Sequence, residues 1–203
     1  MTSTGLHLGA IGSNAVHVAI DMQVYFARDS EWESPATQSI APMVAKIAAH
    51  APYRTVFTRF MVPNKAEDAR GQWQHYYKQW ASLLADRNEA AIYDLLPELL
   101  PFTSEAQVID KTTHSAFGNP EFEKALTAMA ADTLILSGVE TDVCVLGTAL
   151  SAIDRGYRTY LISDALASSD TQSHEATLNT VVPRFDCQIE VLDTATLLEN
   201  WPG

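Results

Sequence analysis

The sequence is poor in cysteine, in basic residues and in long apolar runs, and each shortage excludes a class of protein. Cys144 and Cys187 are the two cysteines among 203 residues, too few for a disulfide-dense secreted scaffold. No apolar run approaches the roughly 18 residues of a membrane span. Lys and Arg total 13 against 25 Asp and Glu, a net charge of −12. We therefore expect neither nucleic acid nor a membrane as a partner.

The composition otherwise indicates one compact domain. Hydrophobic residues make up 47% of the chain, enough for a substantial core in a single domain over residues 1–203. The first residues show neither the basic segment nor the apolar run of a leader, so we expect a cytoplasmic protein with reduced thiols. Residues 63–101 interrupt the pattern as an insertion, which we expect to form one or two helices serving as a lid or an interface.

Short β-branched or apolar runs alternate with helical patterns along the chain. Strands are predicted at residues 16–21, 55–58, 107–110, 133–137, 157–162 and 188–192, and helices at 36–50, 119–130, 142–155 and 173–182. This alternation predicts a largely parallel sheet with helices on both faces and a ligand site beyond the carboxyl ends of the strands. A dinucleotide site is disfavoured because residues 21–26 replace the Gly-rich loop expected after the first strand.

Four chemically useful residues follow consecutive predicted strands: Asp21, Arg59, Lys111 and Cys144. Cys144 comes just after a tight turn, in the first turn of a helix. Free N–H groups and the helix dipole favour the thiolate there, so its pKa is expected to fall below about 8.5. A lone cysteine is more often a packing residue. A carboxylate and an ammonium nearby favour covalent catalysis instead.

Three blocks resemble the signatures of the isochorismatase-like cysteine hydrolases, in the isochorismatase/nicotinamidase superfamily. They are DMQVYF at 21–26, DKTTHSAF at 110–117 and GVETDVCV at 138–145, in that order. The resemblance implies a three-layer α/β/α sandwich around a six-stranded, mainly parallel Rossmann-like sheet, usually assembled into homodimers or homotetramers. It also implies that a catalytic triad cleaves a C–N bond of a small amide, ureide or N-carbamoyl substrate through a thioester. The matching triad residues are Asp21, Lys111 and Cys144.

The same resemblance implies which backbone groups bind the carbonyl oxygen of the substrate. The backbone N–H groups of Glu140 and Cys144 match the oxyanion hole, and a cis peptide bond corresponds to Val139–Glu140. Gln23, Phe26 and Val139 are expected to shape the pocket and contact the substrate.

Other candidates are weaker. Arg59 is expected to bind an anionic or strongly polar substrate by a two-pronged contact, with a surface ion pair to Glu67 or Asp68 as the alternative. His114 follows Lys111 closely and either contacts substrate or lies at the surface. An aromatic group in the insertion has helical spacing, which is typical of plain packing or of a wall over the pocket: Trp73, Tyr76, Tyr77 and Trp80.

One departure from the superfamily pattern concerns metal. Nicotinamidases bind a metal through an aspartate and a histidine after the second strand, where this chain has Arg59, Phe60 and Met61. His75 alone cannot supply a site that needs several ligands. We therefore expect no metal and no cofactor, and nicotinamide is disfavoured as the substrate. The presence of the cysteine likewise disfavours isochorismate ether hydrolysis.

Three alternatives remain open. The chain can be an isochorismatase-like hydrolase of another small-molecule bond. It can be a non-catalytic member of the fold, although the complete set of Asp21, Lys111 and Cys144 argues against that. It can also be a redox thiol protein, which needs a resolving cysteine near Cys144. Cys187 enters the last predicted strand and is expected to be a buried packing residue.

Overall fold

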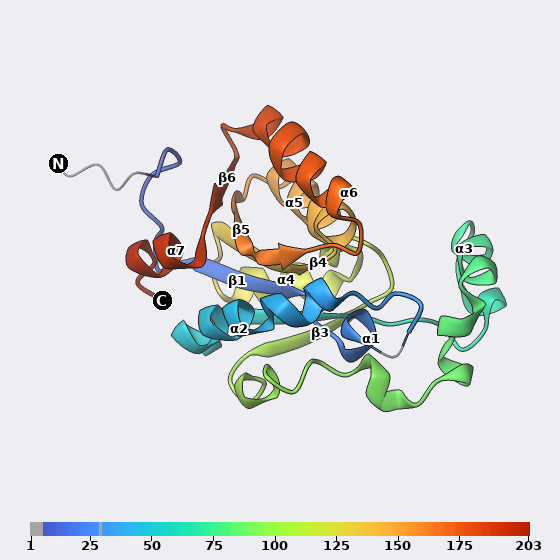
Figure 1. Cartoon of the computed structure of the whole chain (residues 1–203). Helices are drawn as coiled ribbons and strands as arrows, with labels where there is room; N and C mark the ends of the chain where they lie inside the picture. The colour runs from blue at the N-terminus through green and yellow to red at the C-terminus, as the bar shows by residue number, and fades with distance from the viewer. Residues whose placement is uncertain (1–5, 29) are drawn as a thin grey trace.

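The computed structural model describes residues 6–28 and 30–203, so residues 1–5 and 29 of the predicted domain lie outside it. Six strands form one parallel sheet in the order β3-β2-β1-β4-β5-β6 (Figure 1). Their bounds are β1 Ala15–Ile20, β2 Thr55–Phe60, β3 Gln107–Lys111, β4 Thr133–Val139, β5 Arg158–Ala167 and β6 Ile189–Leu192. The six strands predicted from the sequence are all present, and the expected parallel sheet is confirmed.

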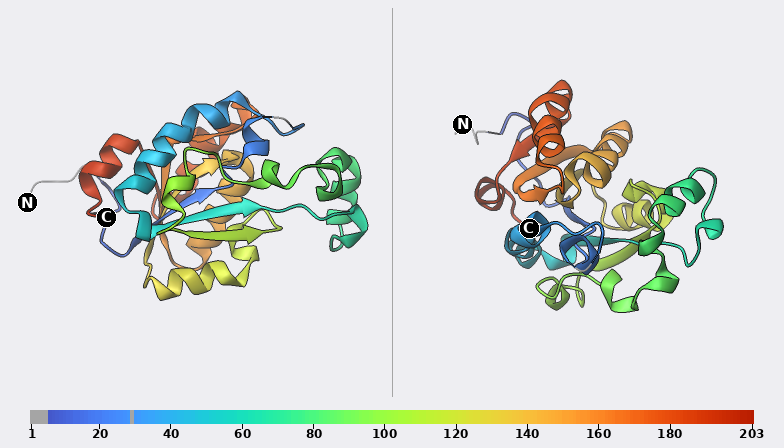
Figure 2. Two further views of the ribbon diagram at one scale, coloured as in Figure 1. Left: turned by 90° about the horizontal axis from the view of Figure 1, so that it is seen from below. Right: turned by 45° about the vertical axis from the view of Figure 1, so that its right-hand side comes forward.

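Helices cover both faces of this sheet and complete the three layers. The bounds are α1 Val24–Ala27, α2 Pro35–His50, α3 Trp73–Gln79, α4 Pro120–Ala128, α5 Leu146–Asp154, α6 Thr171–Ala176 and α7 Thr194–Asn200. Buried residues of α2 and α7 belong to one hydrophobic cluster, whereas those of α4 and α5 belong to another across the sheet. Figure 2 shows α2 and α7 on the side of the sheet opposite α4.

Local sequence explains where the helices begin. Ser34 accepts a hydrogen bond from the N–H of Ala36, and Pro35 occupies the first helical position of α2. Asn119 caps α4 in the same way, followed by Pro120. The central strands β1 and β4 are buried along their whole length, as expected for a parallel sheet covered on both faces.

The insertion at 63–101 is mostly a chain of short 3-10 turns. Besides α3, the turns are Ala66–Asp68, Ala81–Leu83, Ala85–Arg87, Ala90–Tyr93 and Leu100–Phe102. It lies beyond the carboxyl end of β2, which points toward α3 in Figure 2. Tyr77, Leu84 and Leu96 bury their side chains in the same cluster as α2. The insertion is therefore packed onto the domain, with one α-helix where one or two were predicted.

The strand order reverses between β1 and β4, and this is where a ligand site is expected in such a sheet. Gly138 in β4 has φ +106°, and a Cβ there would lie 2.1 Å from the carbonyl oxygen of Ile20. Glycine therefore permits the close approach of the two strand ends. The residues that follow β1 and β4 are brought together by this contact.

Residues 6–28 and 30–203 contain no helix that is both long and apolar enough to cross a membrane.

Candidate active site

A buried ion pair joins the ends of two strands. The ammonium of Lys111, the last residue of β3, lies 2.6 Å from Oδ2 of Asp21, which follows β1, and both side chains are fully buried. Thr58 donates a hydrogen bond of 2.6 Å to the other carboxylate oxygen. Lys111 also donates to the carbonyl oxygen of Thr113 at 3.0 Å. Removing one partner of such a pair leaves an uncompensated buried charge, so the two residues form one unit.

The backbone at Asp21 is unusual as well. Its φ is +53°, a left-handed conformation that non-glycine residues seldom adopt. The N–H of Asp21 donates to the carbonyl oxygen of Thr58 at 3.2 Å and to its hydroxyl at 3.1 Å. Thr58 therefore fixes both the backbone and the carboxylate of Asp21. Such backbone outliers cluster at functional sites.

Cys144 lies beside this pair, in the π-helical turn Thr141–Val145 that leads into α5. Its side chain is buried, and burial raises the pKa of the thiol; Lys111 opposes the rise and Asp21 adds to it. The lowered pKa expected from the helix start is therefore wrong. Two effects raise the pKa of Cys144: the sulfur has lost its surrounding water, and the carboxylate of Asp21 lies nearby. Together they exceed the lowering of the pKa by the ammonium of Lys111.

Several backbone N–H groups of the turn around Cys144 donate within the protein. Val139–Glu140 is a cis peptide bond, as expected. The N–H of Thr141 donates to the hydroxyl of Ser168 at 3.0 Å. The N–H groups of Val143 and Val145 both donate to the carbonyl oxygen of Glu140 at 3.1 Å. The N–H groups of Glu140 and Cys144 stay the predicted oxyanion hole, and none of these three hydrogen bonds uses either of them.

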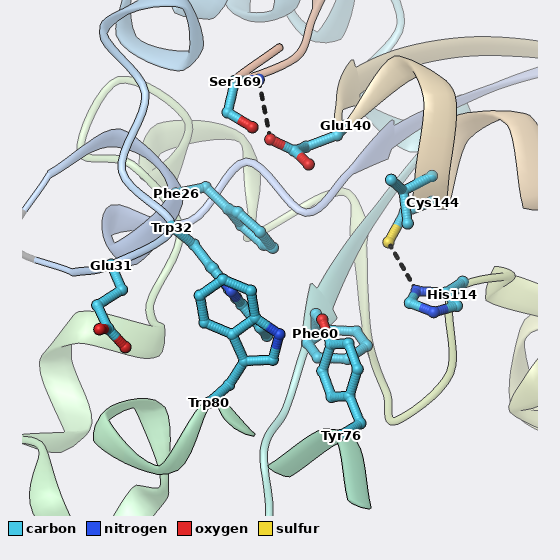
Figure 3. Close-up of a pocket in the computed structure, with 11 residues that line it drawn as sticks. Phe26, Glu31, Trp32, Phe60, Tyr76, Trp80, His114, Glu140, Cys144 and Ser169 are labelled. Carbon is cyan, nitrogen blue, oxygen red and sulfur yellow. Dashed lines mark hydrogen bonds between the residues drawn. The ribbon is translucent and has the colours of Figure 1, made fainter. Parts of the chain in front are cut away.

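A cavity of about 410 Å³ opens onto the sulfur of Cys144 (Figure 3). Its walls are mainly aromatic, with a few polar groups: Phe26, Glu31, Trp32, Phe60, Tyr76, Trp80, His114, Glu140, Val143, Cys144 and Ser169. Of the residues predicted to contact substrate, Phe26 and His114 line this cavity, whereas Gln23, Arg59 and Val139 do not. The volume is in the range of small-molecule sites.

His114 lies between the thiol and the aromatic wall. Its Nδ1 is 4.0 Å from the sulfur of Cys144, and its ring stacks on Phe60 with 6.4 Å between centroids. Burial lowers the pKa of His114, and Lys111 lowers it further, whereas Asp21 opposes the shift. The imidazole is therefore neutral near pH 7 and can offer one donor and one acceptor.

Gln23 does not line the pocket but forms hydrogen bonds with the backbone next to it. Its buried side-chain amide donates to the carbonyl oxygens of Phe60 and Tyr93 at 3.2 and 2.7 Å, and its Oε1 accepts from the N–H of Phe60 at 2.6 Å. It thereby joins β2 to the insertion. Val139 is buried in β4, and the cis peptide bond joins it to Glu140.

Arg59 points away from the pocket, contrary to expectation. Phe60 pairs in register with Lys111 and Arg59 with Asp110, so the second couple lies on the opposite face of the sheet. The guanidinium of Arg59 donates to both oxygens of Asp110, at 2.7 and 3.0 Å, and to Asp94 at 3.2 Å. Arg59 therefore forms an ion pair, as the alternative proposed, although with partners other than Glu67 and Asp68.

Several site residues were missed by the sequence reasoning. Thr58 could have been found, because side chains alternate along a strand and Thr58 shares a face with Phe60. Glu31, Trp32 and Ser169 lie outside the predicted elements and carried no signal. Within the insertion, Tyr76 and Trp80 line the cavity, whereas Tyr77 is buried in the core and Trp73 lies 4.8 Å from His114, ring to ring.

Two further expectations concern Cys187 and metal. Cys187 is exposed, not buried, because it lies in the turn between the 3-10 helix Val182–Phe185 and β6. His75 lies exposed on α3, outside the cavity lining. Across the described part of the chain, no group of three or more His, Cys, Asp or Glu side chains could hold a metal ion.

The parallel sheet in the order 3-2-1-4-5-6, with Asp21, Lys111 and Cys144 joined at its strand ends, defines a Rossmann-like α/β/α protein with a buried thiol site. The chain belongs to the isochorismatase family, because the model of the isochorismatase domain matches residues 15–196. Members of this family are hydrolases that include amidases.

Three similar proteins show how far the similarity in sequence and in structure extends. Nicotinamidase 3 of Arabidopsis thaliana is 33% identical over 76 residues, which cover 37% of this chain and 38% of that protein. The isochorismatase family protein of Desulfovibrio vulgaris subsp. vulgaris str. Hildenborough has a TM-score of 0.78 at 22% identity, covering 92% and 97% of the two chains. The pyrazinamidase/nicotinamidase of Streptococcus mutans UA159 has a TM-score of 0.69 at 26% identity, covering 87% and 99%. The match to the Arabidopsis protein spans about two fifths of its length.

Proposed function

We propose that this protein is a cysteine-dependent hydrolase that cleaves a C–N bond of a small amide, ureide or N-carbamoyl compound through a thioester. The observation that carries the proposal is the buried Asp21–Lys111 pair beside the thiol of Cys144, at the inner end of an aromatic cavity. These groups can act as base, electrostatic partner and nucleophile.

The raised pKa of Cys144 is compatible with this role. Loss of the thiol proton to solvent would place a second negative charge in a buried site, beside Asp21. Transfer of the same proton to Asp21 moves one negative charge from the carboxylate to the sulfur, and Lys111 lies close to both groups. The nucleophile is therefore generated during attack rather than stored as a thiolate.

The same groups can carry the remaining steps, which are acylation of Cys144 and hydrolysis of the thioester. The sulfur of Cys144 bonds to the carbonyl carbon, and the N–H groups of Glu140 and Cys144 hold the oxyanion. Collapse breaks the C–N bond, and Asp21 returns its proton to the leaving amine or ammonia. Water then adds to the thioester and gives one proton to Asp21. Breaking the C–S bond releases the acid and the thiolate of Cys144, and Asp21 returns that proton to the thiolate.

The cavity walls would position the substrate. Phe26 packs against one side of the acyl group, and His114 offers a neutral hydrogen-bonding group next to the sulfur. All the groups in this scheme come from the chain itself, so we propose a reaction without metal or cofactor. We further propose a homodimer or homotetramer that works in the cytoplasm, where reducing conditions keep a catalytic thiol free.

The test is ammonia or amine release from a panel of small amides, ureides and N-carbamoyl amino acids. We expect the wild type and Cys187→Ala to hydrolyse at least one class, and Cys144→Ala to lose turnover of it by a factor of about 10³ or more. Turnover that survives in Cys144→Ala would contradict the proposal, as would a loss in Cys187→Ala, which points to redox chemistry. Absence of hydrolysis across all three substrate classes would also overturn it.

A further inference from the structure

The cavity has two chemically different ends. The thiol of Cys144 and the ring of His114 lie at one end, and Glu31 lies on the other side of the aromatic group in Figure 3. Trp32 is the centre of that group. Its ring lies 5.8 Å from Phe26, 5.8 Å from Trp80 and 5.9 Å from Tyr76, centroid to centroid.

The rings around Trp32 meet it at different angles, and all of them line the cavity. Trp80 meets Trp32 at 67° and Tyr76 meets it at 51°, whereas Phe26 stacks on Trp32 at 11°. The negative face of an aromatic ring attracts a cation. Such a contact already exists in this site, because the ammonium of Lys111 lies 4.7 Å from the ring centre of Phe60.

The charges that line the cavity are negative. Glu31 and Glu140 are the charged residues of the lining, and no Lys or Arg of the described chain belongs to it. Lys111 is neutralised by Asp21, and the imidazole of His114 is neutral near pH 7. The chain as a whole carries −12, which adds to the attraction of a cation and to the repulsion of an anion.

The two carboxylates are not equivalent. Glu140 accepts a hydrogen bond of 2.9 Å from the N–H of Ser169, which holds it near the catalytic turn. Glu31 is exposed at the rim and accepts from the hydroxyl of Ser82 in the insertion. Its carboxylate is therefore held beside Trp32 and Trp80 with capacity for a further partner.

We infer that the substrate carries a positively charged group, which binds among Trp32, Tyr76 and Trp80 with Glu31 as its counter-ion. This inference rests on the proposed function for the other end of the molecule, where the scissile carbonyl meets Cys144. An alkylated ammonium suits the site best, because it combines apolar surface for the rings with charge for the carboxylate. It replaces the anionic substrate that Arg59 led us to expect.

Binding of three matched probes tests this without any turnover. The probes are 4-(trimethylammonio)butanamide, its neutral isostere 5,5-dimethylhexanamide and the anion 4-carbamoylbutanoate. They are titrated calorimetrically into Cys144→Ala, which cannot hydrolyse them by the proposed route. We expect the cation to bind about tenfold more tightly than the isostere and the anion to bind weakest. Equal affinities, tighter binding of the isostere or the anion, or no binding of the cation would overturn the inference.

Matched variants locate the site within the same background. Glu31→Gln should weaken the cation about threefold to tenfold and leave the neutral isostere unchanged. Glu199→Gln is the control, because Glu199 is an exposed carboxylate on α7 outside the cavity. An equal loss in both variants would mean a general field effect and would contradict the assigned counter-ion. If the wild type hydrolyses no substrate but the cation still binds more tightly than the isostere and the anion, the result would count against the proposed reaction alone.

Discussion

The two ends of the cavity are built from different kinds of structure. At the end that we propose to be catalytic, Asp21 and Lys111 are fully buried, lie 2.6 Å apart and are fixed by strands of one parallel sheet. At the aromatic end, Tyr76 and Trp80 are only half-buried and come from a short helix and the residue after it. In our proposal the chemistry therefore depends on the sheet, whereas the choice of substrate depends on the half-buried aromatic end.

The largest effect is expected from replacing Asp21 or Lys111 at the catalytic end. Asp21→Asn and Lys111→Met should each lower kcat/KM on the best panel substrate by about 10³-fold, because both act on one proton transfer. The double variant should be no less active than either single one. Independent, multiplicative losses would contradict a shared step.

Stability provides the control for this pair. Each single change leaves one buried charge without its partner and should lower the free energy of unfolding by about 3 kcal/mol. The double variant should recover part of that stability but none of the activity. Denaturant unfolding of the three variants measures this, and it separates a folding defect from a catalytic one.

The sheet also buries the titratable side chain of His17, which we expect to have no effect on the chemistry. Its ring contacts the hydroxyls of Ser137 at 2.7 Å and Thr55 at 3.4 Å, and burial lowers its pKa from 6.5 to about 3. The unfolded chain therefore binds a proton below pH 6.5 that the folded chain excludes. Stability should fall as the pH drops, by about 2 kcal/mol between pH 7 and pH 5 from this group.

The variant His17→Gln isolates that contribution. It should remove about 2 kcal/mol of the difference in unfolding free energy between pH 7 and pH 5, because glutamine does not titrate. Denaturant curves at the two pH values are the measurement. An unchanged pH dependence would show that His17 is not the group that responds.

The next effect is at the aromatic end. Trp80→Ala removes a wall that contacts Trp32 and should raise KM about tenfold while changing kcat less than about threefold. Tyr53→Ala is the matched control, since Tyr53 is an aromatic side chain that is 59% exposed. A fall in kcat with an unchanged KM would mean that the insertion takes part in the chemical step.

The smallest effect is expected at Arg59. Its ion pairs with Asp110 and Asp94 are on the far face of β2 and partly exposed, so Arg59→Lys should lower stability by no more than about 1 kcal/mol. Steady-state kinetics of this variant should match the wild type within about twofold. A large rise in KM would mean that Arg59 contacts the substrate, which would contradict this placement.

The catalytic end was predictable because its residues follow strands whose apolar pattern is clear. Asp21, Lys111 and Cys144 each sit at or near a strand end, and parallel strands bring such ends together. The face on which Arg59 lies was not predictable, because it depends on the pairing of Phe60 with Lys111. One residue of register reverses every side chain of a strand.

The pKa of Cys144 and the aromatic end were not predictable for a different reason. The pKa depends on how much water the fold removes from the sulfur, which a helix-start argument does not contain. Trp32 and Glu31 lie before α2 in a segment without periodicity, and Ser82 reaches Glu31 from 51 positions along the chain. Such a contact has no signature in local spacing.

Trapping the covalent intermediate tests directly whether a thioester forms at Cys144. The best panel substrate is mixed with wild-type enzyme, quenched in acid within the first turnovers, digested and examined by mass spectrometry. We expect the peptide carrying Cys144 to gain the mass of the acyl group, and neutral hydroxylamine to remove it. Rapid hydrolysis with an acyl group on another residue, or with no acyl group trapped at any quench time while substrate is consumed, would contradict a thioester at Cys144.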